Sequence, residues 1–178
     1  QVSPVKKKYR PVVLKQERKF LKPEESIKLL NYTRHEHLGP VVWLGLLAGL
    51  RVEAIHPLKW GSVEFESSEI LIREAYKRKE KEVKPFPKGK SWERVPMPEM
   101  LADFLKGLKV SQKAGDSDLV CPSENGVMLD YSVILRGVKN LCREAGVTVV
   151  TPHELRHSCT ELYMQLGEAS VEDIRRLL

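Results

Sequence analysis

One stretch of sequence restricts the fold more than any other: the apolar run from Pro40 to Leu50. Wound as a helix from about Leu38 to Ala48, this run carries apolar side chains all round and has no face suited to water. A helix of that kind belongs in the core, so the sequence predicts a central helix with other elements packed around it. Gly49 is a natural C-terminal stop for this helix.

Helix signals recur on both sides of the central stretch. Pro23 stands where a first helical residue is expected, and two glutamates follow it at the positive end of the helix. Ile27, Leu29 and Leu30 are expected to form the buried side of that helix. Asp130 is placed to cap a later helix through its side chain. The expected helices cover residues 23–34, 50–58, 99–108, 130–145 and 152–166, and Ser170 caps a last one.

The period of the apolar residues changes to two in the middle of the chain. Short strands are expected at Val63–Phe65, Glu69–Arg73 and Trp92–Met97, with a long polar hairpin around Lys77–Lys90. Loop is expected over residues 109–118. The fold class predicted is α+β, predominantly helical, with a small three-stranded antiparallel sheet.

The first twenty residues lack the pattern of a folded element. They contain two prolines and a run of lysines but no periodic apolar face. We interpret residues 1–20 as an interdomain linker and residues 21–178 as one folded domain. A chain of 178 residues is long enough for one domain with a real core.

Basic side chains exceed acidic ones and gather in two places. The chain has 30 Lys and Arg against 24 Asp and Glu, a formal net charge of +6. The basic residues concentrate in Lys6–Lys22 and Arg73–Arg94, and clusters of this kind can neutralise phosphates. A solvated charged hairpin explains the second cluster as well. The composition therefore permits a polyanion partner and leaves both interpretations open.

Targeting and redox features are few. No apolar run approaches the roughly 20 residues needed to span a bilayer, and the N-terminus lacks the apolar core of a signal peptide. The cysteines Cys121, Cys142 and Cys159 cannot all pair, and none lies in a CxxC motif. We expect free thiols in a reducing, cytoplasmic setting and no membrane partner.

An arginine follows the central helix at once, in the segment from Ala48 to Arg51. Rigid backbone holds this side chain beside the core, where a charge needs an anionic partner or solvent. One interpretation is a site for an anionic ligand. The other is an ion pair with a nearby acid such as Glu53 or Glu64, and Arg51 alone does not decide between them.

A second charged cluster stands at the start of the helix expected over residues 152–166. Positions i, i+3 and i+4 share a helix face, so His153, Arg156 and His157 project together. Pro152 puts them in the first turn, where free backbone amides and the helix dipole favour an anion. Arginine holds two phosphate oxygens at once, and histidine donates a hydrogen bond or moves a proton. The cluster predicts a phosphate site.

The same residues, from His153 to His157, also spell HExxH, the motif of zinc proteases. In those enzymes two histidines bind the metal and the glutamate acts as a base. Against this interpretation, Arg156 sets a permanent cation beside a divalent metal, and a catalytic zinc needs a third protein ligand. Nothing in the sequence singles out one of the available acids, which are Glu161, Glu168 and Glu172.

Several segments, taken in order, resemble the sequence boxes of tyrosine recombinases, the phage-integrase and Xer-like enzymes. Residues 18–25 (RKFLKPEE) resemble the lead-in to the catalytic domain. Residues 48–51 (AGLR), with 58–60 (LKW) following, resemble the first arginine box. Residues 88–97 (KGKSWERVPM) resemble the β-hairpin that presents a catalytic lysine, and 153–157 (HELRH) resemble the HxLRH box. One such box is common, whereas three in order at compatible spacing are specific.

The resemblance assigns roles to individual residues. It implies that Arg51 and Arg156 stabilise the phosphate oxygens as charge builds on the phosphorus. It implies that Lys88 protonates the leaving 5′-oxygen and that His153 assists proton transfer. Lys90 is a rival to Lys88 as the general acid. Further contacts with DNA are expected from Lys59, Lys90 and His157.

The sequence also departs from the family. The glutamate usual three residues after the first arginine is replaced by Ala54, with Glu53 one position earlier. The family's closing Gly-His pair and nucleophilic tyrosine are expected beyond Leu178. We therefore expect a catalytic domain that is C-terminally incomplete and does not itself cleave DNA. Tyr163 is expected to pack on the core, and Cys159 to be a buried thiol.

The function implied is site-specific DNA recombination of the integrase type, by strand cleavage and rejoining through a 3′-phosphotyrosyl intermediate. The implied partners are double-stranded DNA and other protomers in a synaptic tetramer, with no small-molecule substrate and no metal or other cofactor. Three alternatives remain open. A non-catalytic DNA-binding module would lack a downstream tyrosine, a type IB topoisomerase would relax supercoils without sequence preference, and a zinc protease would bind zinc stoichiometrically.

Overall fold

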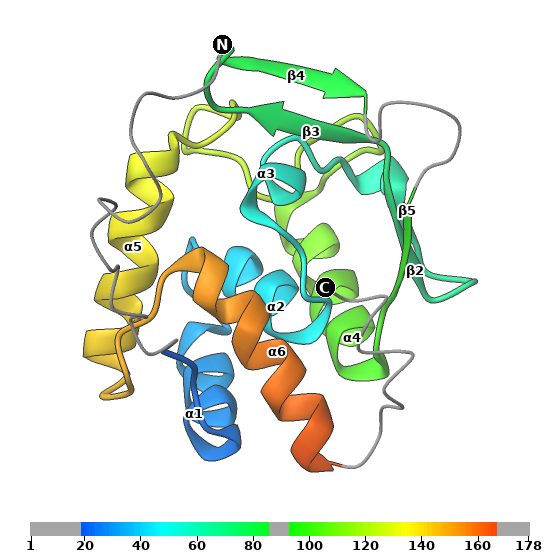
Figure 1. Cartoon of the computed structure of the whole chain (residues 1–178). Coiled ribbons are helices and arrows are strands. Elements are labelled where there is room, and N and C mark those ends of the chain that lie inside the picture. Colours follow the sequence, from blue (N-terminus) through cyan, green and yellow to red (C-terminus); the bar gives the residue numbers. More distant parts are fainter. Residues whose placement is uncertain (1–18, 86–92, 167–178) are drawn as a thin grey trace, which may run out of the picture.

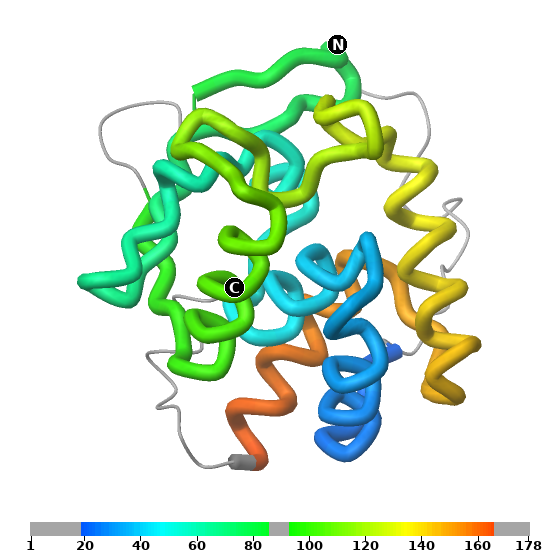
Figure 2. Tube along the Cα trace, turned by 180° about the vertical axis from the view of Figure 1, so that it is seen from behind, coloured from blue at the N-terminus to red at the C-terminus, as the bar shows by residue number. Residues whose placement is uncertain are grey.

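Helices surround a central helix in the computed structural model, which describes residues 19–85 and 93–166. The central helix is α2 (Gly39–Leu47), and α1 (Pro23–Thr33), α4 (Glu99–Gln112) and α6 (Pro152–Leu166) all pack against it. Figure 1 shows α6 crossing in front of α2. The view from behind in Figure 2 places α1 on one side of α2 and α4 on the other. No helix in these two ranges is both long and apolar enough to cross a membrane.

All nine residues of α2 are buried, which confirms the central helix predicted from the sequence. Trp43 of α2 stacks on Phe104 of α4 with 4.1 Å between the ring centroids. On the side facing α6, Gly45 allows a close approach, because a Cβ atom there would lie only 3.2 Å from the Cβ of Leu155. Helix α4 is therefore held to α2 by a stacked aromatic pair, and α6 approaches α2 closely because Gly45 has no side chain.

The chain bends sharply where α2 ends. Gly49 has φ 58°, and the next amide, of Leu50, donates to the carbonyl of Leu44 at 3.2 Å. A residue without a Cβ adopts this left-handed conformation without steric cost, which ends the helix as predicted. The following helix, α3 (Val52–Ile55), is shorter than the 50–58 expected, because Arg51 stays extended as its N-cap residue.

The sheet expected in the middle of the chain is present. Strands β1 (Val63–Glu64), β2 (Glu69–Ile72) and β5 (Glu93–Pro96) form an antiparallel sheet in the order β1-β2-β5. Ile70 stands opposite Val63 on one side and Val95 on the other, so buried residues meet across the sheet. The prediction of a predominantly helical α+β fold with a three-stranded antiparallel sheet is confirmed.

A second, two-stranded sheet lies in the segment expected to be only a polar hairpin. It consists of β3 (Glu74–Lys77) and β4 (Glu82–Pro85), paired antiparallel. Figure 1 shows this hairpin along one edge of the molecule, and β3 packs against α3. Only Ala75 in this hairpin is buried, which explains why its sequence reads as a polar loop.

The ends of the later helices follow the sequence signals in part. The side chain of Asp130 accepts a hydrogen bond from the Ser132 amide at 2.7 Å and caps α5 (Tyr131–Glu144), as predicted. Helix α4 continues to Gln112, so the loop expected from residue 109 begins later. Ile27 was expected in the core but has 53% of its surface exposed, since Leu29 and Leu30 already cover the inner side of α1.

We expect Leu155→Ala to destabilise the chain by about 2–5 kcal/mol, because the side chain is fully buried at the α2–α6 crossing and its loss leaves a cavity. Chemical denaturation would measure the change in the free energy of unfolding. Met164→Ala is the matched control on the same helix, because Met164 is 54% exposed and its truncation should cost less than about 0.5 kcal/mol. Equal effects of the two substitutions would contradict this account of the core.

Candidate active site

A hollow of about 430 Å³ opens where α3, β3, β5 and α6 meet. Three residues predicted from two separate sequence boxes, Arg51, His153 and Arg156, line it together. The turn between β3 and β4 adds further basic side chains to the wall. The charged residues around the hollow are the cations Arg51, Lys77, Arg78, Lys79 and Arg156 and the carboxylates Glu53, Glu80 and Glu93. Cations outnumber carboxylates, so the hollow suits an anion.

Arg156 is the buried member of this group, with 6% of its surface exposed. Its Nη1 donates a hydrogen bond to the carbonyl of Gly49, at the sharp bend after α2. Burial, and then the neighbouring Arg51 cation, lower the pKa of Arg156, while the charge of Glu93 acts in the opposite direction. A guanidinium nevertheless stays protonated in proteins. The site thus holds a desolvated positive charge, and an anion entering the hollow would stabilise it.

Arg51 reaches the same hollow from the other side of the bend. It is the extended residue before α3, and its carbonyl accepts the first amides of that helix, from Ala54 and Ile55. Its side chain is exposed. The two guanidinium groups therefore differ: that of Arg156 is fixed within the fold, and that of Arg51 stands at the surface of the hollow. Two such groups can hold the two non-bridging oxygens of one phosphate.

His153 and His157 lie one helical turn apart on α6. Their rings meet edge to face with centroids 4.7 Å apart, and the two Nε2 atoms lie 3.2 Å from each other. His153 is exposed and lines the hollow; His157 is half-buried and does not contribute to the wall. The helix spacing therefore brings His153 and Arg156 to the hollow, with His157 in contact with His153 behind them.

The glutamate of the HExxH segment is engaged in capping α6. The Glu154 carboxylate accepts the Thr151 amide at 2.7 Å, and the Thr151 hydroxyl accepts the Glu154 amide at 3.3 Å. This reciprocal pair is a capping box, so Glu154 serves the helix end instead of a metal-bound water. In the part of the chain that the structure describes, no three or more His, Cys, Asp or Glu residues are grouped to hold a metal ion.

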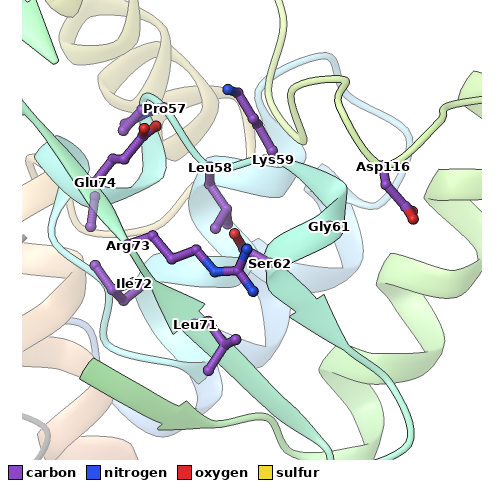
Figure 3. Close-up of a pocket in the computed structure, with 11 residues that line it drawn as sticks. Pro57, Leu58, Lys59, Gly61, Ser62, Leu71, Ile72, Arg73, Glu74 and Asp116 are labelled. Carbon is purple, nitrogen blue, oxygen red and sulfur yellow. The ribbon is translucent and has the colours of Figure 1, made fainter. Parts of the chain in front are cut away.

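Lys59 is not part of the main hollow. It borders a smaller one of about 180 Å³, together with Arg73, Ser62 and Asp116. Figure 3 shows the Arg73 guanidinium extending toward Ser62, whereas the Lys59 side chain extends away from it. Lys59 thus stays a predicted DNA contact apart from the two arginines. Lys88 and Lys90, the candidate general acids, lie outside the described residues.

A cluster of rings that no sequence pattern predicted holds the β3–β4 hairpin in place. His56, only 4% exposed, has its ring centroid 5.2 Å from that of Tyr76 on β3 and 6.5 Å from that of Tyr131 on α5. The guanidinium of Arg78 lies over the Tyr131 ring at 3.7 Å. These residues come from three distant segments, so no local pattern links them. The cluster positions the basic turn beside the hollow.

Two residues expected to pack in the core, Tyr163 and Cys159, do contribute to the packing of α6. The Tyr163 hydroxyl donates to the carbonyl of Leu47 at 2.8 Å, joining α6 to α2. Cys159 is 1% exposed, and burial raises the pKa of its thiol to about 12, which keeps it protonated and unreactive. All three cysteines are free and buried, as expected for unpaired thiols.

The fold and the hollow define a helical domain that presents two arginines and a histidine to an anion, and comparisons with known proteins give its family. The sequence profile of the phage integrase family matches residues 19–177. The chain therefore belongs to the phage integrase family, and it has the fold of a tyrosine recombinase catalytic domain. The XerC-like tyrosine recombinase of Caldanaerobacter subterraneus subsp. tengcongensis is 29% identical over 164 residues, 79% of this chain and 42% of that protein.

Solved structures share the fold at lower identity. XerA recombinase matches 95% of this chain and 57% of its own with a TM-score of 0.72 and 23% identity. The Tn1549 transposon integrase, in complex with transposon right end DNA, matches 92% and 58% with a TM-score of 0.74 and 14% identity. A λ integrase dimer bound to a core site matches 96% and 60% with a TM-score of 0.65 and 18% identity. The chain spans about half the length of these relatives.

We expect the stability of the chain to fall as the pH drops below neutrality, because of His56. Burial lowers the pKa of His56, and Arg78 acts in the same direction, whereas Glu53 and Asp130 oppose the shift. The unfolded chain therefore takes up this proton at a higher pH than the folded chain. The stabilisation is complete above the ordinary histidine pKa of about 6.5 and is lost as the pH falls toward the lower folded value.

His56→Phe keeps a ring in the cluster but removes the titration. Its thermal midpoint should fall less between about pH 7.5 and about pH 5 than that of the unmodified chain. His35→Gln, at an exposed histidine between α1 and α2, should leave the pH profile unchanged. An identical acid-induced loss of stability in His56→Phe and the unmodified chain would contradict this assignment.

Proposed function

We propose that the protein containing this chain is a tyrosine recombinase that performs site-specific DNA recombination by cutting and rejoining strands. The observation that carries the proposal is the convergence of Arg51, His153 and Arg156 on one cationic hollow. Family membership supports the reaction type, and the segments that resemble the family's boxes supply these three residues. The hollow is suited to one scissile phosphate of the DNA backbone.

In the proposed reaction, a tyrosine of the recombinase attacks the phosphorus, and the bond from phosphorus to the 5′-oxygen breaks. Arg51 and Arg156 stabilise the negative charge that builds on the two non-bridging oxygens. Lys88, or its rival Lys90, donates a proton to the leaving 5′-oxygen, and His153 hydrogen-bonds the phosphate and assists proton transfer. The product is a 3′-phosphotyrosyl bond, which the 5′-hydroxyl of a partner strand attacks in reverse to rejoin the DNA.

The same proposal extends to the surroundings of the site. The basic turn between β3 and β4 and the predicted contacts Lys59, Lys90 and His157 would bind phosphates flanking the scissile one. A λ integrase tetramer bound to a Holliday junction has this fold, with a TM-score of 0.64 and 18% identity. We propose that four protomers assemble in the same way on two DNA duplexes, in the cytoplasm. The reaction needs no cofactor, because the phosphotyrosyl bond retains the energy for rejoining.

The two arginines can be tested in the full-length protein with a nicked suicide substrate that traps the covalent intermediate. Arg156→Ala and Arg51→Ala should each reduce the rate of trapping by about 100-fold or more, the usual effect of removing one donor to a developing oxyanion. Arg136→Ala, at an exposed arginine of α5, is the control and should trap DNA normally. Arg51 is exposed, so its variant separates loss of chemistry from loss of folding.

Normal trapping in both arginine variants would overturn the site assignment. Specific DNA binding by the full-length protein, without any covalent product, would favour a non-catalytic DNA-binding module of the same fold.

We expect Lys79→Ala to weaken binding of duplex DNA and to lower the dependence of log K on log salt by about one unit, because one phosphate contact is lost. Binding would be measured as a function of salt concentration with the 178-residue chain. Lys106→Ala is the control: that side chain lies on α4, 3.7 Å from Asp103 and outside the hollow. An unchanged salt dependence in Lys79→Ala would remove the hairpin turn from the DNA interface.

A further inference from the structure

The alternation of strand β5 places a carboxylate on the inner face of the sheet. Val95 of this strand is buried, and Glu93, two residues before it, points to the same face because side chains alternate along a strand. The intervening Arg94 points the other way and pairs with Glu69 at 2.6 Å and Glu64 at 3.4 Å. Glu93 is therefore directed at the helices, and it lines the cationic hollow.

Of the three carboxylates that line this hollow, two have other partners. Glu80 forms an ion pair with Lys84 across the β3–β4 hairpin. Glu53 acts on His56, where its charge raises the pKa that burial lowers. Glu93 is the carboxylate that acts on Arg156, against the lowering of the pKa of that residue by burial and by Arg51. Glu93 thus differs from Glu53 and Glu80 in both its position on β5 and its electrostatic effect on Arg156.

We infer that Glu93 is a built-in counter-ion of the phosphate site, balancing Arg156 when no DNA is bound and competing with phosphate for the hollow. The inference rests on the proposed function, since it takes the hollow to be the phosphate site. A buried guanidinium needs a negative charge nearby in the free protein. The same negative charge repels a phosphate that enters beside it.

This double role has an unusual consequence: loss of the carboxylate should change stability and anion affinity in opposite directions. Glu93→Gln removes the charge and keeps the shape. The free protein should become less stable, because Arg156 loses its counter-charge. Its affinity for phosphate should nevertheless rise, by roughly three- to tenfold, because the repulsion is gone. A residue that merely orders the arginines would lower both quantities together.

The experiment measures the midpoint of thermal unfolding of the 178-residue chain at increasing concentrations of inorganic phosphate. Sodium chloride at equal ionic strength is the reference. The phosphate-dependent rise gives an apparent Kd by mass action. Asp103→Asn is the matched control, because it removes an exposed carboxylate on α4 that does not line the hollow. Glu93→Asp keeps the charge and should keep the Kd within about twofold of the unmodified chain.

The expected result is a lower thermal midpoint of Glu93→Gln without phosphate and a tighter Kd for phosphate, while Asp103→Asn changes neither. A fall in both stability and phosphate affinity, or a Glu93→Gln variant that behaves like Asp103→Asn, overturns the assignment of Glu93 as the counter-ion. A Glu93→Asp variant that binds phosphate as tightly as Glu93→Gln also overturns this assignment, because the rise in phosphate affinity would then not depend on loss of the negative charge. If the unmodified chain and Arg51→Gln bind phosphate equally, the phosphate site itself fails, and the proposed function fails with it.

Discussion

The hydrogen bond from the Arg156 guanidinium to the Gly49 carbonyl is the contact on which the geometry of the site depends. It joins α6 to the end of α2, the helix at the centre of the core. The left-handed bend at Gly49 is followed two residues later by Arg51, so one short segment bears on both guanidiniums. The Gly49 carbonyl accepts the hydrogen bond from Arg156, and the bend directs the backbone toward Arg51. Because this segment connects α2 and α3, which pack on each other, the core sets the positions of the Gly49 carbonyl and the Arg51 backbone.

Gathering cations in one place opposes folding, and ring contacts at the edge of the hollow offset this repulsion. The turn from Lys77 to Lys79 carries three positive charges toward the two arginines. The hairpin that bears this turn is held by rings: Tyr76 packs on His56, and Arg78 lies over Tyr131. Burial favours the neutral form of His56, which keeps a further positive charge away from this group.

The parts of this fold that could be predicted from the sequence are those decided locally. A helix that is apolar all round has only the core to occupy, and the spacing of His153 and Arg156 puts both on one helix face whatever surrounds them. What the sequence could not show depends on distant partners. Ile27 is exposed whereas Leu29 and Leu30 of the same helix are buried, and the β3–β4 hairpin is held by rings from separate segments.

Ala54, which replaces the family's usual glutamate, shows the same difference between local sequence and distant partners within the site. The family's usual glutamate at this position would stand on α3, whereas here a small buried side chain lines the hollow and the carboxylate that acts on Arg156 comes from Glu93, on strand β5. Electrostatic balance depends on where a charge lies in space, and two segments far apart in sequence can present it to the same guanidinium. The absence of a glutamate at position 54 therefore does not leave the hollow without carboxylates, because Glu53 and Glu93 both line it.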